Sequence, residues 1–375
     1  MSFAVKGWCP GAHRPMLSGD GYVVRVRPRL ARLSTAQAQG LCAAAEAHGA
    51  GLIDLTNRAN IQIRGVAETA WTGLIADLEH LDLLDPDAAT ETRRNIVVTP
   101  FWTDGDDTQR LANELMARLH DLPSLPPKMG FAIDAGTGPV LGGVSADFRI
   151  ERGASGALIL RAEGRATGTP LRPGAEIDTL IRLAHWFVDS SGPEAGRMVR
   201  HAAPLPDWAA QTEAPAPAHL PLRPGRHPMG AAQGFAFGQV RARDLARALT
   251  DSGAAALRVT PWRVALLETG VPGPRNGLLW DADAPELRVD ACPGAPFCPQ
   301  ASVETRDLAR RLAPHVTGRL HVSGCAKGCA RMTAADTVVI GQDGRYALAQ
   351  NARAGDTPAQ TGLSADQILA HFGAA

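Results

Sequence analysis

Four cysteines in the last quarter of the chain constrain its fold more than any other feature. The sequence reads Cys292-Pro-Gly-Ala-Pro-Phe-Cys298 and, after 26 further residues, Cys325-Ala-Lys-Gly-Cys329. A proline follows Cys292 and another follows Cys298, which keeps this backbone out of helix. Glycines beside the cysteines allow tight bends that turn backbone N–H groups toward sulfur. The pattern therefore predicts loops that gather several thiolates around one centre.

Three kinds of site fit four such cysteines. A [4Fe–4S] cluster takes one cysteine per iron. Structural zinc usually has about two to four residues inside its first cysteine pair, whereas five separate Cys292 from Cys298. Disulfides are the third alternative, but nothing else in the sequence indicates an oxidising compartment. We interpret the four cysteines as [4Fe–4S] ligands and expect Cys9 and Cys42 to be dispensable for the site.

Length and composition indicate a globular protein of more than one structural unit. The chain has 375 residues, of which 45% are hydrophobic and 20% charged, and its formal net charge is zero. Zero net charge argues against general nucleic-acid binding, and no apolar run approaches the roughly 18 residues of a membrane span. The N-terminus lacks the apolar stretch of a signal peptide. We therefore expect a cytoplasmic protein, and a monomer.

Two strands predicted near the N-terminus, at 22–27 and 60–64, each carry one polar face. Side chains alternate between the two faces of a strand, so each of these groups is aimed to a single face: Arg25 and Arg27; Asn60, Gln62 and Arg64. Through residue 66 the chain has eight Lys and Arg against three Asp and Glu. Because arginine binds carboxylates through a planar fork, this excess suits a polycarboxylate ligand. A solvated sheet face is the alternative.

The second half of the chain repeats the order of predicted elements. After the strand at 22–27, Ser34 and Gln37 form a capping-box pattern that begins a helix ending near His48. The same order is predicted for a strand at 234–241, a helix at 244–250 and strands within 256–267. The sequence of residues 156–170 also resembles that of residues 344–358. The simplest explanation is a duplicated architecture. Since the second copy lacks the polar alternation, we expect one working site.

The cysteine motif resembles that of the sulfite/nitrite reductase superfamily, which couples a [4Fe–4S] cluster to a tetrapyrrole. The sequence His321-Val-Ser-Gly-Cys-Ala-Lys-Gly-Cys resembles that of one branch of the superfamily, the precorrin-3B synthases. The resemblance implies an α+β fold with duplicated nitrite/sulfite reductase-like architecture, in which two ferredoxin-like half-domains join sheet-containing cluster and tetrapyrrole modules. The implied units are an N-terminal segment with the first half-domain (1–85), a first reductase-like module (86–205), a Pro-rich linker (206–228), the second half-domain (229–280) and the cluster module (281–375).

The resemblance also implies tetrapyrrole contacts. Segments around Arg25 and from Thr56 to Arg64 are similar to those that hold the carboxylates of sirohaem, and Arg94 and Lys128 match further cations of the family. The implied substrate-binding residues are Arg25, Arg27, Arg58, Asn60, Gln62, Arg64, Arg94 and Lys128. An ordinary surface lysine is the alternative for Lys128. Sirohaem reductases carry a second lysine where this chain has Gly130, which argues against multi-electron reduction of sulfite or nitrite.

The activity implied by the resemblance is that of an oxidoreductase, a monooxygenase of aerobic cobalamin biosynthesis. It would use O2 to hydroxylate precorrin-3A at C20 with closure of a γ-lactone. Family members use a [4Fe–4S] cluster and are associated with an additional mononuclear non-haem iron, whose ligands the sequence does not single out. Alternatives are a sirohaem-dependent sulfite or nitrite reductase and a non-catalytic iron–sulfur electron-transfer or zinc-stabilised scaffold protein.

No catalytic residue is assigned, and the electron source is expected to lie outside the chain. The segment from Gly136 to Gly142 only approximates a dinucleotide fingerprint and lacks the βαβ context. We therefore expect an external NAD(P)H-linked donor. The 11 histidines contain no zinc-like i, i+4 pair, and most are expected at the surface or in structural roles.

Overall fold

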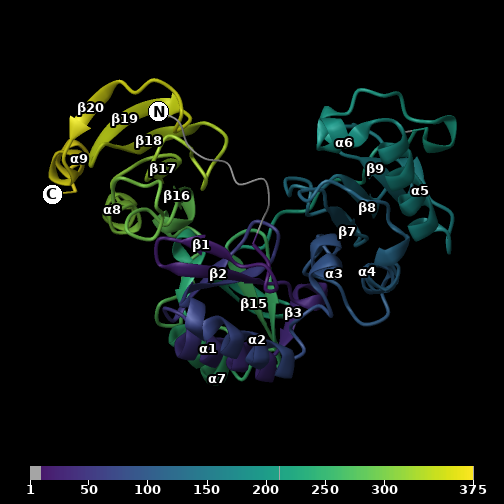
Figure 1. Cartoon of the computed structure of the whole chain (residues 1–375), viewed down its shortest axis with the longest axis horizontal. Coiled ribbons are helices and arrows are strands. Elements are labelled where there is room, and N and C mark those ends of the chain that lie inside the picture. The colour runs from purple at the N-terminus through teal and green to yellow at the C-terminus, as the bar shows by residue number, and fades with distance from the viewer. Residues whose placement is uncertain (1–9, 211, 375) are drawn as a thin grey trace.

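The computed structural model describes residues 10–210 and 212–374, so the expectation for Cys9 lies outside the described residues. Its strands form four five-stranded sheets within these ranges. Figure 1 shows two of the sheets together, beside helices α1 (Thr35–His48), α2 (Glu68–His80) and α7 (Ala242–Ser252). The other two sheets lie above this part of the molecule in Figure 1, one at the left and one at the right.

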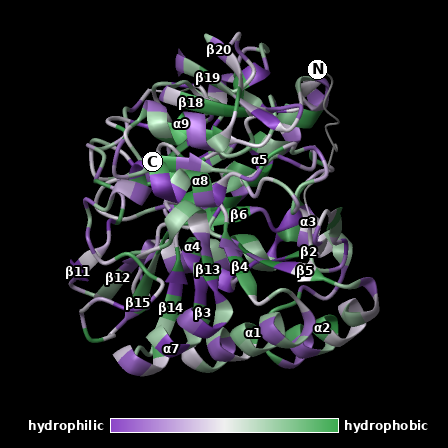
Figure 2. Ribbon diagram, turned by 90° about the vertical axis from the view of Figure 1, so that its left-hand side faces the viewer, coloured by the Kyte–Doolittle hydropathy of each residue, from purple (hydrophilic) through white to green (hydrophobic). Residues whose placement is uncertain are grey.

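The two neighbouring sheets have the same topology. Sheet 1 has the strand order β1 (Met16–Ser18), β2 (Gly21–Val26), β5 (Ile61–Val66), β4 (Leu52–Leu55), β13 (Gln239–Arg241). Sheet 3 has the strand order β11 (Gly225–His227), β12 (Gly230–Gly234), β15 (Val264–Glu268), β14 (Ala256–Val259), β3 (Arg32–Ser34). The two halves exchange a strand, because β3 pairs with β14 and β13 pairs with β4. The row of strands from both sheets runs above the three helices in Figure 2.

The exchange corrects one expectation. A single strand at 234–241 was predicted, but the chain turns at Phe237, whose φ is 58°, and divides this stretch between two sheets. The first half has the same break, with a φ of 53° at Leu30. The capping box predicted at Ser34 and Gln37 is confirmed, since each side chain accepts from the other residue's backbone N–H. Apolar residues of β2, β4 and β5, including Val24, Ile53 and Ile63, are fully buried.

The two remaining sheets also share one topology. Sheet 2 has the order β6 (Ile96–Val98), β7 (Phe131–Asp134), β8 (Phe148–Arg152), β9 (Leu158–Ala162), β10 (Thr169–Pro170). Sheet 4 has the order β16 (Val289–Ala291), β17 (Leu320–Ser323), β18 (Ala335–Gln342), β19 (Arg345–Ala352), β20 (Gln360–Leu363). In each sheet the first three strands are parallel and the last two antiparallel. The expected α+β fold with a duplicated architecture is therefore confirmed.

Short helices complete the structure. They are α3 (Ala88–Arg93), α4 (Asp107–Ala117), α5 (Glu176–Asp189), α6 (Gly192–Ala195), α8 (Arg306–Leu312) and α9 (Ala365–His371). Helix α5 has the buried apolar stripe of a core helix, and Leu180, Leu183 and Phe187 are fully buried. Among the described residues, no helix combines the length and the apolar character needed to cross a membrane.

Candidate functional site

The predicted polar residues of β2 and β5 lie on the same face of sheet 1. Arg25 is directly opposite Gln62, Gln62 is opposite Asp54 of β4, and Asp54 is opposite Gln239 of β13. Directly opposed residues of an antiparallel sheet project to the same side. A row of polar side chains therefore crosses four strands, while the apolar residues between them face the helices.

A cavity of about 260 Å³ lies at one end of this face, and three of the predicted cations line it together with Arg14. They are Arg25, Arg27 and Arg58. Arg27 Nη1 lies 2.7 Å from Glu91 Oε1, and both side chains are nearly buried. The cavity is below the roughly 300 Å³ of typical small-molecule sites, so only one edge of a large molecule could enter it.

The side chains of Arg94 and Lys128 do not line this cavity. The guanidinium of Arg94 is buried and binds both carboxylate oxygens of Asp85, at 2.6 and 2.9 Å, and Nη2 donates to the carbonyl oxygen of Arg27 at 2.9 Å. Arg94 therefore supports the strand end that carries Arg27. Lys128 is exposed, and its carbonyl oxygen accepts from Arg58 Nη2 at 2.9 Å. The main chain of Lys128, rather than its ammonium, is thereby placed beside the cavity.

Arg64 is buried in an acidic network away from that cavity. Its guanidinium binds both oxygens of Asp20, at 2.9 and 3.1 Å, and lies 3.5 Å from Asp54 Oδ2. It also donates to the carbonyl oxygen of Phe297 at 3.3 Å. Two carboxylates therefore compensate the charge of Arg64. Through its bond to Phe297, Arg64 also connects the polar face to the segment that carries Cys298. Asn60, the residue before β5, is also buried.

The four predicted cluster ligands lie on two loops at the end of sheet 4. Cys292 is buried and Sγ accepts from the Gly324 backbone N–H at 3.2 Å, a contact that the bend beside Cys325 permits. Burial raises the pKa of the Cys292 thiol, and the thiols of Cys298 and Cys325 contribute in the same direction. Cys292 therefore stands in the electrostatic field of both, as expected of neighbouring ligands.

Cys329 completes the group. The residue as a whole is exposed, yet its thiol is partly removed from water, and this desolvation is the main cause of its raised pKa. The other three cysteines also raise the pKa, whereas Lys327 lowers it. No three His, Cys, Asp or Glu side chains in the described ranges converge closely enough to form a finished metal site. The two loops are joined by the bonds from Gly324 N–H to Cys292 Sγ and from Ser302 N–H to the Gly324 carbonyl, and the four thiols do not form a closed ligand set. Four soft ligands with one backbone N–H already on sulfur suit a [4Fe–4S] cluster.

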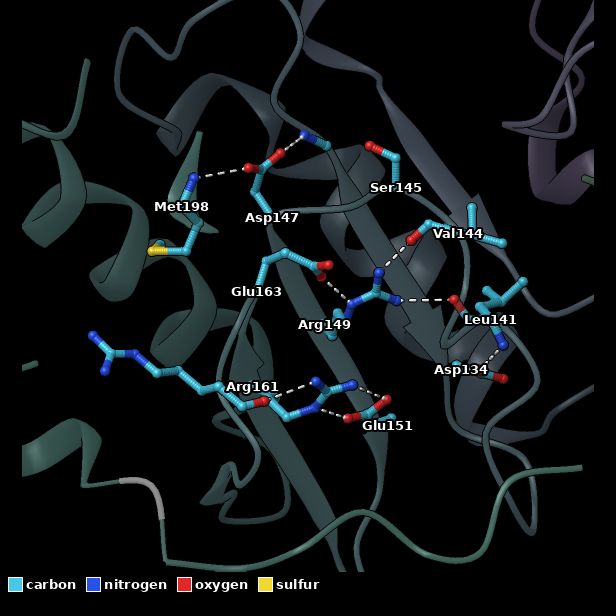
Figure 3. Close-up of polar contacts among 12 residues, drawn as sticks. Asp134, Leu141, Val144, Ser145, Asp147, Arg149, Glu151, Arg161, Glu163 and Met198 are labelled. Carbon is cyan, nitrogen blue, oxygen red and sulfur yellow. Dashed lines mark hydrogen bonds and ion pairs between the residues drawn. The ribbon is translucent and has the colours of Figure 1, made fainter. Parts of the chain in front are cut away.

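The sequence reasoning missed Arg197. Asp147 has no exposed surface and accepts from the backbone N–H groups of Met198, at 2.9 Å, and Gly130, at 3.1 Å (Figure 3). The same carboxylate accepts from Arg197 Nε at 2.8 Å, and Arg197 Nη2 donates to Ser145 Oγ at 2.9 Å. Ser145 Oγ also lies 3.5 Å from Arg58 Nη2. No motif links Arg197 to Arg58, because 139 positions separate them and only the fold joins them through Ser145.

Gly130 has a structural reason to lack a side chain. A Cβ at this position would lie 3.0 Å from both the side-chain nitrogen and the carbonyl oxygen of Asn95. Asn95 Nδ2 in turn donates to the carbonyl oxygen of Met129 at 2.6 Å. A side chain at 130 would therefore require Asn95 to shift by a few tenths of an ångström.

The second copy serves as an internal control for the polar face. Sheet register pairs Ala232 with Leu266 and Leu266 with Arg258, as Arg25 pairs with Gln62 and Gln62 with Asp54. The turn that precedes β5 and the turn that precedes β15 match as well, with left-handed residues at Ala59 and Arg263. The positions equivalent to Arg25, Arg58, Asn60, Gln62 and Arg64 are Ala232, Trp262, Val264, Leu266 and Glu268.

At the positions equivalent to Arg25, Asn60 and Gln62, the face of sheet 3 is filled by protein, whereas Arg258 and Glu268 pair with each other beside a cavity. Leu222 packs there with Ala232, Val264 and Leu266, all buried. The same backbone therefore forms without the arginine, asparagine and glutamine residues of sheet 1. Their presence in the first copy is not a requirement of the fold.

Comparisons with known proteins identify the fold and the family. Residues 14–81 match the model of the nitrite/sulfite reductase ferredoxin-like half domain. The structure of the Mycobacterium tuberculosis NirA protein superposes with a TM-score of 0.57, at 18% sequence identity, over 92% of this chain and 78% of that one. A protein named precorrin-3B synthase from Sinorhizobium sp is 30% identical over 394 aligned residues, which cover 94% of this chain and 84% of the relative.

The fold and the half-domain match define the class: a protein of nitrite/sulfite reductase architecture. Within that class the identity to the Sinorhizobium protein is decisive because it extends over nearly the whole of both chains. The chain belongs to the precorrin-3B synthase family.

Proposed function

We propose that this protein is a precorrin-3B synthase, which uses O2 to hydroxylate C20 of precorrin-3A and closes the ring-A acetate to a γ-lactone. The observation that carries the proposal is the polar face of sheet 1. It gathers Arg25, Arg27 and Arg58 at one cavity, whereas the second-copy equivalents of Arg25, Asn60 and Gln62 are apolar and packed against Leu222. A substrate with about eight carboxylates suits such a face, because arginine forms charge-assisted bonds to carboxylates.

The reaction balances with an external reductant. One oxygen atom of O2 enters the substrate and the other leaves as water, which takes up two electrons and two protons. The family implies a [4Fe–4S] cluster, and Cys292, Cys298, Cys325 and Cys329 would hold it. When bound, such a cluster supplies one-electron transfer. We assign the electron source to an NAD(P)H-linked partner protein.

The chain's own residues would bind and orient the substrate. Arg25, Arg27 and Arg58 would take carboxylates at one edge of the macrocycle, with Arg27 held in place by Glu91. The bond from Arg64 to the carbonyl of Phe297 would keep this face at a constant position relative to the cysteine loop. Fixed orientation of a bound reactant is a large part of what an enzyme contributes.

The proposal is tested with anaerobically purified protein. Iron, acid-labile sulfide and the visible spectrum are measured first, and the protein is then incubated with precorrin-3A, a reduced ferredoxin system and 18O2. We expect a product heavier than precorrin-3A by one 18O atom, and no product from the Cys325→Ser variant. Bound sirohaem with sulfite reduction, or zinc without iron, would refute the proposal.

A further inference from the structure

A histidine buried beneath the cysteine loop has no partner for its ring. His321, on β17, has no exposed surface, and neither Nδ1 nor Nε2 forms a hydrogen bond with any residue that the structure describes. Imidazole always carries at least one N–H, and a buried donor without an acceptor is unfavourable. An orphaned polar group in a native interior therefore calls for a partner that the described residues do not supply, such as an ordered water or a bound group.

The position of the ring identifies that partner. Asp290 of β16 is directly opposite His321, and alternation along the strands puts Cys292 and Ser323 on the same face of sheet 4. Ser323 Oγ donates to the carbonyl oxygen of Cys325 at 2.7 Å, so the cysteine loop folds back over this face. A Cβ built on Gly328 would lie 3.5 Å from Cε1 of His321. The ring thus lies between the sheet and the loop from Cys325 to Cys329.

The polar groups around the ring are occupied elsewhere. Asp290 forms ion pairs with three guanidinium groups, those of Arg263, Arg319 and Arg331, at 3.3, 3.7 and 3.3 Å, and accepts a hydrogen bond from Arg331. Burial lowers the pKa of His321 to about 4, with Arg331 acting in the same direction and Asp290 against it. Near neutral pH the ring is therefore uncharged and offers one donor and one acceptor.

We propose that His321 is a positioning residue whose ring N–H donates a hydrogen bond to a sulfur atom of the [4Fe–4S] cluster or of its thiolates. This inference rests on the proposed function, which places the cluster on these cysteines. Hydrogen bonds to sulfur stabilise the more negative, reduced cluster and raise its reduction potential. His321 would in this way make the cluster easier to reduce without touching the substrate.

Variants of the holoprotein test the proposal. His321→Leu removes the donor and retains bulk, His321→Gln keeps an N–H, and His315→Gln, at an exposed position of the same module, is the matched control. Iron and sulfide are counted, and the midpoint potential is measured by an EPR-monitored titration. We expect the leucine variant to shift the reduction equilibrium about tenfold toward the oxidised form, which is about 59 mV for a one-electron couple. The glutamine variant should recover part of the shift, and the control none.

If the leucine variant does not bind the cluster, a measurement on the wild-type protein still tests the proposal. In protein grown with 15N-histidine, pulsed EPR of the reduced cluster should detect a weak coupling to an imidazole nitrogen. Absence of that coupling, or a loaded leucine variant with the wild-type potential, overturns the inference and leaves the proposed function standing. A wild-type protein that holds no iron–sulfur cluster would instead overturn the proposed function.

Discussion

Arg64 Nη2 and the carbonyl oxygen of Phe297 are hydrogen-bonded at 3.3 Å, which joins β5 of sheet 1 to the residue before Cys298. Two further donors converge on the same oxygen, Ser18 Oγ at 2.6 Å and the Gly19 backbone N–H at 3.1 Å. The segment carrying Cys298 is therefore anchored to sheet 1 and the turn before β2 through one main-chain atom.

The first prediction concerns this anchor. Ser18→Ala removes one of the three donors without unpairing a buried charge, so we expect the fold to remain and the cluster to be lost several-fold faster. The measurement is the decay of the visible iron–sulfur absorption in the presence of a chelator. Ser124→Ala, at an exposed site, is the control and should decay as the wild type does. Equal decay rates for the two variants would show that the anchor does not protect the cluster.

The second prediction concerns the substrate face. A hydrogen bond to a charged group contributes about 1.5–3 kcal/mol, and about 1.4 kcal/mol is tenfold in affinity. Arg25→Gln and Arg58→Gln should each weaken anaerobic binding of precorrin-3A roughly 10- to 100-fold while the cluster spectrum stays unchanged. Arg311→Gln, at an exposed position of the cysteine-bearing half, is the control. Wild-type affinity in both test variants would return this surface to a solvated sheet face.

Local patterns predicted much of the first half-domain. Alternation along β2 and β5, and the capping box at Ser34 and Gln37, depend on neighbouring residues, so sequence reasoning could find them. The same reasoning could not find the exchange of β3 and β13 between the sheets. Each is only three residues long and pairs with a strand of the other half.

The partners of the ion pairs likewise could not be predicted from the sequence. The count of basic residues indicated an anion-binding face, but it could not distinguish an arginine that lines a cavity from one that a carboxylate holds. Arg94 is held by Asp85 on the irregular segment before α3, and Arg64 by Asp20 in the turn before β2. Only the fold brings these acids to the guanidinium groups, and their separations follow no periodic pattern.

The third prediction tests Arg197. Its Nε and Nη2 connect Asp147 to Ser145, beside Arg58, so we expect this guanidinium to support the substrate edge near the loop at Lys128. Arg197→Gln should raise the KM for precorrin-3A about tenfold, with a smaller change in kcat. Arg200→Gln, an exposed cation on the same segment, should leave both parameters unchanged. Equal effects of the two substitutions would exclude a specific role for Arg197.

The last prediction is a pH dependence of stability at Asp134. Burial raises the pKa of this carboxyl from 3.8 to about 6, and Glu151 adds to the shift. The backbone N–H groups of Val140 and Leu141 donate to Oδ2 at 2.7 Å, and these bonds lower the pKa, as does Arg149. The Leu141 contact is drawn in Figure 3. Because the folded pKa lies above the unfolded one, the folded state favours the protonated acid. Wild-type stability from this group is therefore highest below about pH 4 and falls as the pH rises to about 6.

Asp134→Asn cannot ionise and lacks that slope. A shift of this size corresponds to about 2–3 kcal/mol, so the free energy of unfolding of the variant relative to wild type should rise by about that amount between pH 4 and 6 and stay constant above. Urea unfolding at a series of pH values measures it. Asp251→Asn, at an exposed position, should give a constant difference. If the Asp134→Asn difference is equally constant, the buried carboxyl is already ionised without penalty, and the network around it compensates the charge fully.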